Sequence, residues 1–193
     1  MVRLSQIASL RKLIHIGGVL FVPLALYNQY LALVLAVLGT TLFIIFEHLK
    51  HQVAPGFFRH LYRDHELGGV AYEPLAYLLS IVALLALSLV FMPLACYVAI
   101  IVMTIGDGVA ALTGRATQGP KLPFSRKTWA GSLAGFAVAT VAGCLVAGPV
   151  AIAGAAGGMA AEAYAGKYDN ALVAAVALVC TALAAILFPA LVP

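Results

Sequence analysis

Residues 104–136 read TIGDGVAALTGRATQGPKLPFSRKTWAGSLAGF, and this stretch carries the two features on which the interpretation of the whole chain depends. It begins inside an apolar run that places Asp107 between two glycines, which permit close backbone approach. A carboxylate at the end of a membrane-spanning helix is costly to desolvate, so such groups usually serve a function. Four cations follow within the next twenty residues, namely Arg115, Lys121, Arg126 and Lys127. Together the acid and the cations predict a site for a metal ion and a polyphosphate.

The composition is that of a membrane protein. Of the 193 residues, 64% are hydrophobic and only 9% are charged, whereas soluble domains carry about 25% charged residues. The mean hydropathy is +1.06. The net charge of +4 comes from Lys and Arg residues scattered over short connections, which is not the basic stripe of a nucleic-acid-binding protein. We therefore predict an all-α, polytopic integral membrane protein with a single domain over residues 1–193 and no nucleic-acid partner.

Apolar runs divide the chain into seven candidate membrane spans. A spanning helix needs about 17–25 residues, or fewer where the bilayer thins. The runs cover residues 13–26, 30–46, 75–91, 94–112, 132–147, 150–163 and 171–188. In a seven-helix arrangement all eleven Lys and Arg residues fall on one side, which the positive-inside rule makes cytoplasmic. We expect the N-terminus inside and the C-terminus outside, in a prokaryotic cell (inner) membrane with the polar site toward the cytoplasm.

Three acidic residues near the charged face are candidate metal ligands, because hard divalent cations bind several oxygen atoms. Asp107 would either coordinate Mg²⁺ or accept a proton from a hydroxyl nucleophile, and its structural alternative is an ion pair with Arg115. Glu162 ends the sixth apolar run without an evident capping role. Asp169 begins the seventh run, where a helix N-cap is the simpler explanation.

The connection from Gly114 to Ser132 contains the groups that phosphoryl transfer requires. Positioning a phosphate and neutralising its charge calls for cations, backbone N–H groups, hydroxyls and a metal ion. The candidate phosphate-binding residues in this connection are Arg115, Lys121, Lys127, Thr128, Gly131 and Ser132. The order GxxxxGK[ST] does not occur in the sequence, so a P-loop is not expected. A basic loop that binds anionic lipid headgroups is the alternative.

Small residues in the last third of the chain predict close helix packing. Gly131 and Gly135 are four residues apart, as are Gly154 and Gly158. In a bilayer there is no hydrophobic driving force between helices, and small residues at this spacing let their backbones approach closely. Gly131 also lies near enough to the basic connection for its backbone to contact a phosphate.

Two further segments supply candidate residues. The charged connection between the second and third runs resembles an interfacial helix, and Arg63 and Glu66 within it could face the site. Arg11, Lys12 and His15 are close enough in sequence to share one helical face. Positive charge that orients the first span is sufficient to explain Arg11 and Lys12, whereas a histidine inside an apolar start is less expected.

Five motifs, taken in chain order, resemble those of the dolichol kinase and phytol kinase family. They are RKxxH at 11–15, RxxE at 63–66, GDGVAALTGR from Gly106, KxPFxxKTWxGS from Lys121, and Glu162 followed by Asp169 and Asn170. Members of this family are integral-membrane kinases that use CTP to phosphorylate long isoprenoid alcohols, and a diacylglycerol kinase branch is similar. The resemblance therefore implies CTP as the phosphoryl donor, Mg²⁺ or Mn²⁺ as the cofactor, and a membrane lipid alcohol as the acceptor.

The residue roles follow from the chemistry and the resemblance together. We expect Asp107 and Glu66 to be catalytic, and the metal ion to be held by Asp107, Glu162 and Asp169. Phosphates would bind to the residues of the basic connection named above and to Arg63. Further candidate site residues are Arg11, Lys12, His15 and Asn170. One departure concerns Ala130, which stands where relatives commonly carry Glu in the order KTxEGS; it bears on the donor and the substrate more than on the reaction class.

Other functions stay open at this point. A cytidylyltransferase that forms a CDP-lipid would release pyrophosphate, whereas a kinase would release CDP. A diacylglycerol kinase would differ only in the acceptor. A transporter or channel would place ionisable groups near the midplane of broken helices, whereas here they gather at one edge. A catalytically inactive scaffold would bind a nucleotide without turnover. The sequence predicts neither the alcohol nor the oligomeric state.

Overall fold

The computed structural model of the chain describes residues 12–49, 70–166 and 169–193. These residues are helical and contain no strand. Four helical segments are long and apolar enough to cross a membrane, namely Gln29–Leu49, Pro93–Thr117, Trp129–Tyr164 and Asn170–Leu187. Two shorter apolar helices, Lys12–Tyr27 and Tyr72–Ser88, accompany them. The predicted all-α class is confirmed, and the four long apolar helices are those of a membrane protein.

The helices lie close to the predicted apolar runs. After the first turns from Lys12, the order is η1 (Gly18–Leu20), α2 (Phe21–Tyr27), α3 (Gln29–Leu49), α6 (Tyr72–Ser88), α7 (Pro93–Ile101), the π-helical η2 (Val102–Gly106), α8 (Asp107–Thr117), α9 (Trp129–Ala147), η3 (Gly148–Val150), α10 (Ala151–Tyr164), α11 (Asp169–Leu187) and η4 (Pro189–Leu191). The largest difference is that the helix of the fourth run continues past residue 112 to Thr117. Hydropathy marks the apolar part of a helix, whereas polar turns extend α8 beyond it.

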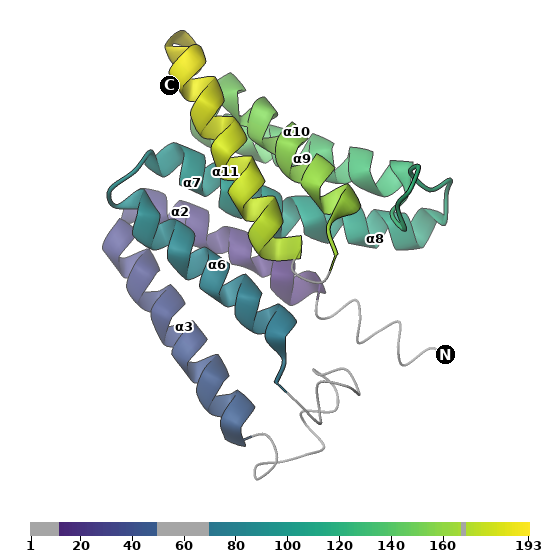
Figure 1. Cartoon of the computed structure of the whole chain (residues 1–193). Helices are drawn as coiled ribbons and strands as arrows, with labels where there is room; N and C mark the ends of the chain where they lie inside the picture. Colours follow the sequence, from purple (N-terminus) through teal and green to yellow (C-terminus); the bar gives the residue numbers. More distant parts are fainter. Residues whose placement is uncertain (1–11, 50–69, 167–168) are drawn as a thin grey trace.

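The long apolar segment Trp129–Tyr164 consists of two helices. Gly148 ends α9 with a φ of 66°, a conformation that glycine adopts without a steric penalty. The chain then reverses through η3, and α10 packs back against α9. Figure 1 shows α9 and α10 lying beside each other. The fifth and sixth predicted runs are therefore separate helices.

The segment α7–η2–α8 lies at the centre of the helix bundle. Every residue of α7 from Ala95 to Ile101 is buried. This helix contacts α2, α6, α9, α10 and α11. In Figure 1, α3 lies at one edge of the bundle and α9 and α10 at the other, with α7 between them. The central position of this segment places its polar residues among several helices.

Glycines allow the helices beside this centre to approach closely. A Cβ on Gly135 of α9 would lie 2.6 Å from the carbonyl oxygen of Gly106 and 2.9 Å from the Cβ of Ala110. A Cβ on Gly158 of α10 would lie 2.9 Å from the Cβ of Ala177 in α11. Real Cβ atoms do not come this close to a neighbour, so the predicted packing role of these glycines is confirmed.

We expect Gly135→Ala to destabilise the protein, because its methyl group meets the backbone of η2, which cannot rotate away. Overpacking of this kind costs about 1–3 kcal/mol. The matched control is Gly39→Ala in α3, where nothing lies within 4 Å of an added Cβ. Thermal unfolding of the purified protein in detergent should show a lower midpoint for Gly135→Ala and an equal or higher one for Gly39→Ala, since alanine favours helix. Equal midpoints for the two variants would contradict this packing.

Candidate functional site

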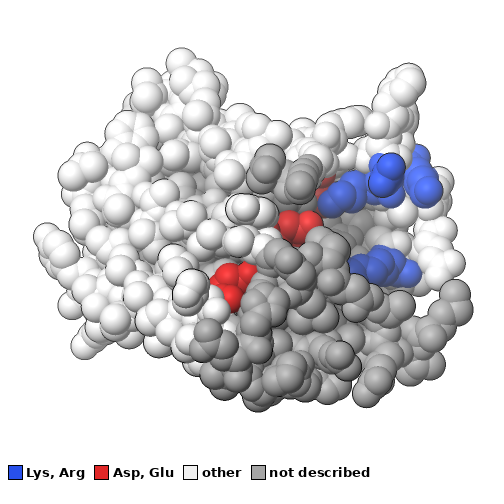
Figure 2. Space-filling view, turned by 60° about the horizontal axis from the view of Figure 1, so that its bottom comes forward, with Lys and Arg blue, Asp and Glu red and all other residues white. Residues whose placement is uncertain are grey.

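Charged side chains gather on one face of the molecule. Figure 2 shows Lys and Arg atoms next to Asp and Glu atoms on the face that it turns forward, while much of the remaining visible surface is uncharged. Glu47, Glu73, Arg115 and Glu162 stand near the helix ends that border the connections 50–69, 118–128 and 165–168. This gathering at one edge agrees with the prediction of a polar face.

Asp107 lies inside a continuous helical run and not at its end. The sequence predicted that this carboxylate is at the end of a spanning helix, but Pro93–Thr117 is helical throughout. Its flanking glycines have ordinary roles in packing: an added Cβ on Gly108 would clash with Ile16, and one on Gly106 would lie 3.1 Å from Met159 Sδ. The glycines therefore admit neighbouring side chains and do not break the helix. Asp107 itself is only 3% exposed.

Two side chains of the first helix neutralise this buried carboxylate. The Lys12 Nζ donates to Asp107 Oδ2 at 2.5 Å, and His15 Nε2 lies 3.2 Å from the same oxygen. Arg115, which the sequence offered as the partner in the structural alternative, is exposed further along α8, and Lys12 makes the ion pair with Asp107 in its place. A buried carboxylate without such partners would be strongly destabilising.

Glu162 brings a second carboxylate to the same place from α10. Its side chain is fully buried and forms an ion pair with Lys127 of the basic connection 118–128. The two carboxylates are near enough for their charges to interact. Glu162 Oε2 has no hydrogen-bond partner among the described residues. The structure therefore joins Asp107, Glu162, Lys12 and Lys127 in one cluster, as the sequence predicted for the two acids.

This cluster has the chemistry of a divalent-cation site to which the protein contributes two carboxylates, while phosphates and water would contribute the other ligands. Two adjacent buried carboxylates repel each other unless a proton or a cation lies between them. No three His, Cys, Asp or Glu side chains within the described part of the chain form a group that could hold a metal ion. Mg²⁺ commonly takes one or two carboxylates from the protein and its other ligands from phosphates and water. Asp107 and Glu162, with its unpartnered Oε2, fit this requirement.

The basic connection 118–128 is a hydrogen-bonded hairpin. Leu122 N donates to the Lys127 carbonyl at 2.9 Å, and Trp129 N donates to the Pro120 carbonyl at 3.1 Å. Ser125 Oγ donates to the Ala163 carbonyl at 2.5 Å, which fastens the hairpin to the end of α10. The side chains of the predicted phosphate-binding residues Lys121 and Arg115 are exposed beside it.

Phe124 stands at the tip of this hairpin in an unusual conformation. Its φ is 58°, in the left-handed region that bulky residues rarely occupy, and its side chain is fully exposed. The backbone conformation has a free-energy cost, and the exposed ring gains no burial that would offset it. A residue held in this way marks the hairpin as a candidate binding element.

Three predicted phosphate ligands lie at the start of α9. Thr128 Oγ1 accepts a hydrogen bond from Gly131 N at 3.2 Å and caps the helix. Gly131 is buried, and an added Cβ would lie 2.6 Å from the Ala110 carbonyl oxygen. Ser132 Oγ is buried without a partner among the residues the structure describes. Thr128 and Gly131 thus have structural roles, whether or not a phosphate also contacts their backbone.

Several predicted residues are not placed by the structure. Arg11, Arg63 and Glu66 lie outside the described residues, and so does the side chain of Asp169. The backbone of Asp169 begins α11, and Asn170 lies in the first turn of that helix. Their proposed roles stay predictions.

Tyr77 is a site residue that the sequence did not indicate. Its hydroxyl donates to the backbone carbonyl of His15 at 2.6 Å, and the two rings lie 4.1 Å apart between centroids. A tyrosine inside an apolar run looks like an ordinary core residue, and no local pattern distinguishes it. The shared helical face of Lys12 and His15 is a signal in the sequence, since an isolated acid in a spanning run needs a basic partner.

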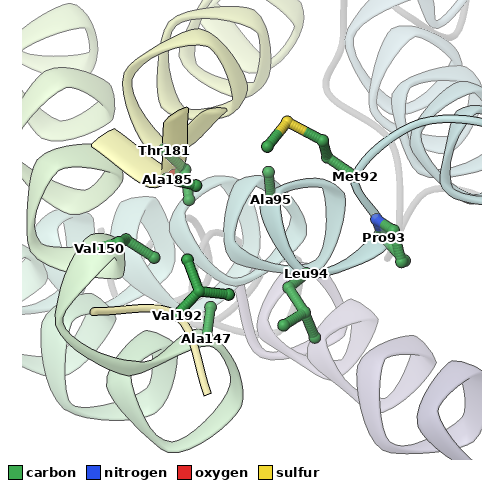
Figure 3. A pocket seen from close by; sticks show the side chains of 9 residues that line it. All are labelled: Met92, Pro93, Leu94, Ala95, Ala147, Val150, Thr181, Ala185 and Val192. Atoms are coloured by element: carbon green, nitrogen blue, oxygen red, sulfur yellow. The ribbon is translucent and has the colours of Figure 1, made fainter. Parts of the chain in front are cut away.

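An apolar cavity among the described residues is separate from this cluster. It encloses about 220 Å³ and is lined by Met92, Pro93, Leu94, Ala95, Ala147, Val150, Thr181, Ala185 and Val192. Figure 3 shows these side chains around the start of α7, next to α11 and the C-terminal segment. Twelve or more residues of helix, about 18 Å at 1.5 Å per residue, separate it from Asp107. The chemistry of the charged cluster therefore does not involve this cavity.

No protein-family model matches the chain, and neither a curated protein nor a solved structure matches it.

The ion pair between Lys127 and Glu162 should show energetic coupling in a double-mutant cycle. Lys127→Met leaves the buried carboxylate of Glu162 without its cation, and Glu162→Gln leaves the Lys127 ammonium group without its anion. The double variant removes both charges of the pair. We expect a coupling energy of about 0.5–3 kcal/mol from unfolding in denaturant. Arg126→Met, next to Lys127 but exposed, is the matched control and should change stability by less than about 0.5 kcal/mol. Additive effects of Lys127→Met and Glu162→Gln would contradict the pairing.

Proposed function

We propose that this protein is a membrane-embedded kinase that transfers the γ-phosphate of a nucleoside triphosphate, CTP on the resemblance described above, to an isoprenoid alcohol. The observation that supports this proposal most strongly is the meeting of two buried carboxylates, Asp107 and Glu162, beneath a basic hairpin. Phosphoryl transfer needs this combination of acids, cations and N–H groups. The dolichol and phytol kinase family and its diacylglycerol kinase branch remain the resemblance that suggests the substrates.

In this proposal the chain's own groups divide the work. Asp107 and Glu162 would hold Mg²⁺ or Mn²⁺, with Asp169 as a further ligand, and a bound ion would supply positive charge beside the phosphates. Lys127, Lys121 and Arg115 bind phosphate oxygens. In its alternative role as the base, Asp107 accepts the proton of the alcohol while the alcohol oxygen bonds to the γ-phosphorus, and the bond from that phosphorus to the β–γ bridging oxygen breaks with release of the nucleoside diphosphate. Glu66 is the other candidate base.

The membrane arrangement in the proposal is the seven-span topology. Support comes from the separation of α9 from α10 at Gly148 and from the two shorter apolar helices, Lys12–Tyr27 and Tyr72–Ser88. With those included, the apolar helical segments of the described residues number seven. The positive-inside rule then assigns the charged face to the cytoplasm, here of a prokaryotic cell, where nucleoside triphosphates are available.

The transport alternative has less support. The inner segment of the central helix, Ala95 to Ile101, is buried and apolar apart from Tyr97, whose hydroxyl accepts from Gln29 Nε2 at 2.9 Å. A transport path would need polar groups or water along this part of the bundle. The charged cluster at one edge favours chemistry at a membrane surface.

A product assay tests the reaction. We expect purified protein with γ-labelled CTP, Mg²⁺ and an isoprenoid alcohol such as phytol, geranylgeraniol or a longer polyprenol to give labelled lipid phosphate and CDP. ATP and diacylglycerol in parallel reactions define the donor and the acceptor. Release of pyrophosphate would identify a cytidylyltransferase instead, and nucleotide binding with no product from any acceptor would leave a scaffold. Asp107→Asn should lower turnover by about 10²–10³-fold or more, whereas Glu47→Gln, an acid that bonds Ala71 N at the edge of the bundle, should retain it.

The exposed ring of Phe124 is proposed as the surface on which the nucleobase stacks. Stacking of a base on an aromatic side chain contributes about 1–3 kcal/mol, so Phe124→Ala should raise the KM for the nucleotide by roughly 5–150-fold. Phe124→Trp should restore it, because the larger ring also stacks. The KM for the lipid should not change in either variant. A rise in the lipid KM, with the nucleotide KM unchanged, would place Phe124 at the membrane instead.

A further inference from the structure

His15 Nε2 lies between two hydrogen-bond acceptors. It is 2.9 Å from the Met103 carbonyl oxygen and 3.2 Å from Asp107 Oδ2. A carbonyl oxygen cannot donate a hydrogen bond. Asp107 Oδ2 already accepts from the Lys12 ammonium group at 2.5 Å, which makes it an acceptor as well. The hydrogen shared among these atoms must therefore be on Nε2, whether the ring is neutral or protonated.

The π-helical turn η2 makes the Met103 carbonyl available. The backbone N–H of Asp107 bonds to the carbonyls of Val102 and Thr104 and passes over that of Met103. A regular α-helix would direct the N–H of residue 107 to the carbonyl of residue 103. Insertions of this kind occur frequently at functional sites. His15 supplies a donor to Met103 and thereby links the first helix to the turn that carries Asp107.

The ring of His15 also packs against Tyr77. Tyr77 contacts the ring and donates to the backbone carbonyl of His15 at 2.6 Å. Gly18, one turn further along, leaves the space for the Tyr77 hydroxyl, because an added Cβ there would clash with it. The ring contact and the hydrogen bond both come from Tyr77 of α6, which is far from His15 in the sequence. The imidazole therefore has a fixed place and a fixed orientation.

We infer that His15 is a positioning residue, which uses Nε2–H to hold Asp107 Oδ2 against the π-helical turn and leaves Oδ1 as the oxygen that faces the reactants. Both the Lys12 contact and the His15 contact are made to Oδ2. His15 does not take the alcohol's proton through Nε2, because that nitrogen already carries hydrogen. The effect on turnover rests on the proposed kinase function, whereas the position of the hydrogen does not.

Nuclear magnetic resonance tests the position of the hydrogen without any substrate. The full-length protein, labelled with ¹⁵N-histidine in nanodiscs, gives separate signals for the two ring nitrogens, and His15→Gln identifies those of His15 by their loss. We expect hydrogen on Nε2 in the resting protein. A ring with hydrogen only on Nδ1 would overturn the inference, whatever reaction the protein catalyses.

Variants test the positioning role in turnover. The amide nitrogen of His15→Gln can reach the place of Nε2 and donate a hydrogen bond, whereas His15→Asn is too short and His15→Leu has no donor. We expect His15→Leu and His15→Asn to lower kcat by about 10–100-fold with little change in either KM, and His15→Gln to recover most of it. His48→Leu, an exposed histidine of α3, is the matched control and should resemble the wild type.

The outcomes separate the two proposals. A merely structural His15 would give equal losses for Gln, Asn and Leu together with lower thermal stability, and this result would overturn the positioning role. If the wild type transfers no phosphate to any alcohol, the kinase proposal fails, and the Nε2–H assignment is still decided by the nitrogen spectrum of the folded protein.

Discussion

The burial of one carboxylate in an otherwise apolar helix is the constraint on which the rest of this structure depends. Asp107 lies on the most central helix of the bundle and is almost completely removed from solvent. In such surroundings an ionised acid is tolerated only with a charged partner and hydrogen bonds to it. Lys12 and His15 supply both from the first helix. The first helix must therefore pack against α8 and η2 in one register.

Small residues then determine which other groups can reach this acid. Gly135 lets α9 touch the backbone of η2, and Gly131 does the same for α8. Gly158 brings α10 against Val102 of η2 and against α11. Since α10 carries Glu162, this close approach is what places the second carboxylate beside the first. Helix packing by small residues, which is common in membranes, serves here to assemble a polar cluster.

The cluster consists of two ion pairs that are built in the same way. Each acid belongs to a helix of the bundle, and each is neutralised by a lysine from a segment at the charged edge. Lysine is a compact charge on a flexible stem, so it can leave a carboxylate for a phosphate oxygen without any movement of the backbone. The hairpin is fastened to α10 by Ser125, which keeps Lys127 near Glu162 while Phe124 stays in solvent. These features fit a site that receives a charged, soluble ligand at one edge of an apolar body.

The sequence by itself determined the membrane class and the limits of most helices, and it singled out Asp107 and Glu162 as unusual acids in apolar runs. Hydropathy and helical length are local properties, and an acid in an apolar run is conspicuous without any knowledge of its neighbours. The partners were decided only by the tertiary structure: Lys12 is 95 positions from Asp107, and Lys127 is 35 positions from Glu162. The sequence likewise predicted close approach at the glycines around Asp107, and the tertiary structure decided which groups approach, namely Ile16 at Gly108 and Met159 at Gly106. Contacts over such separations depend on which helices lie side by side, and no local pattern of residues contains that information.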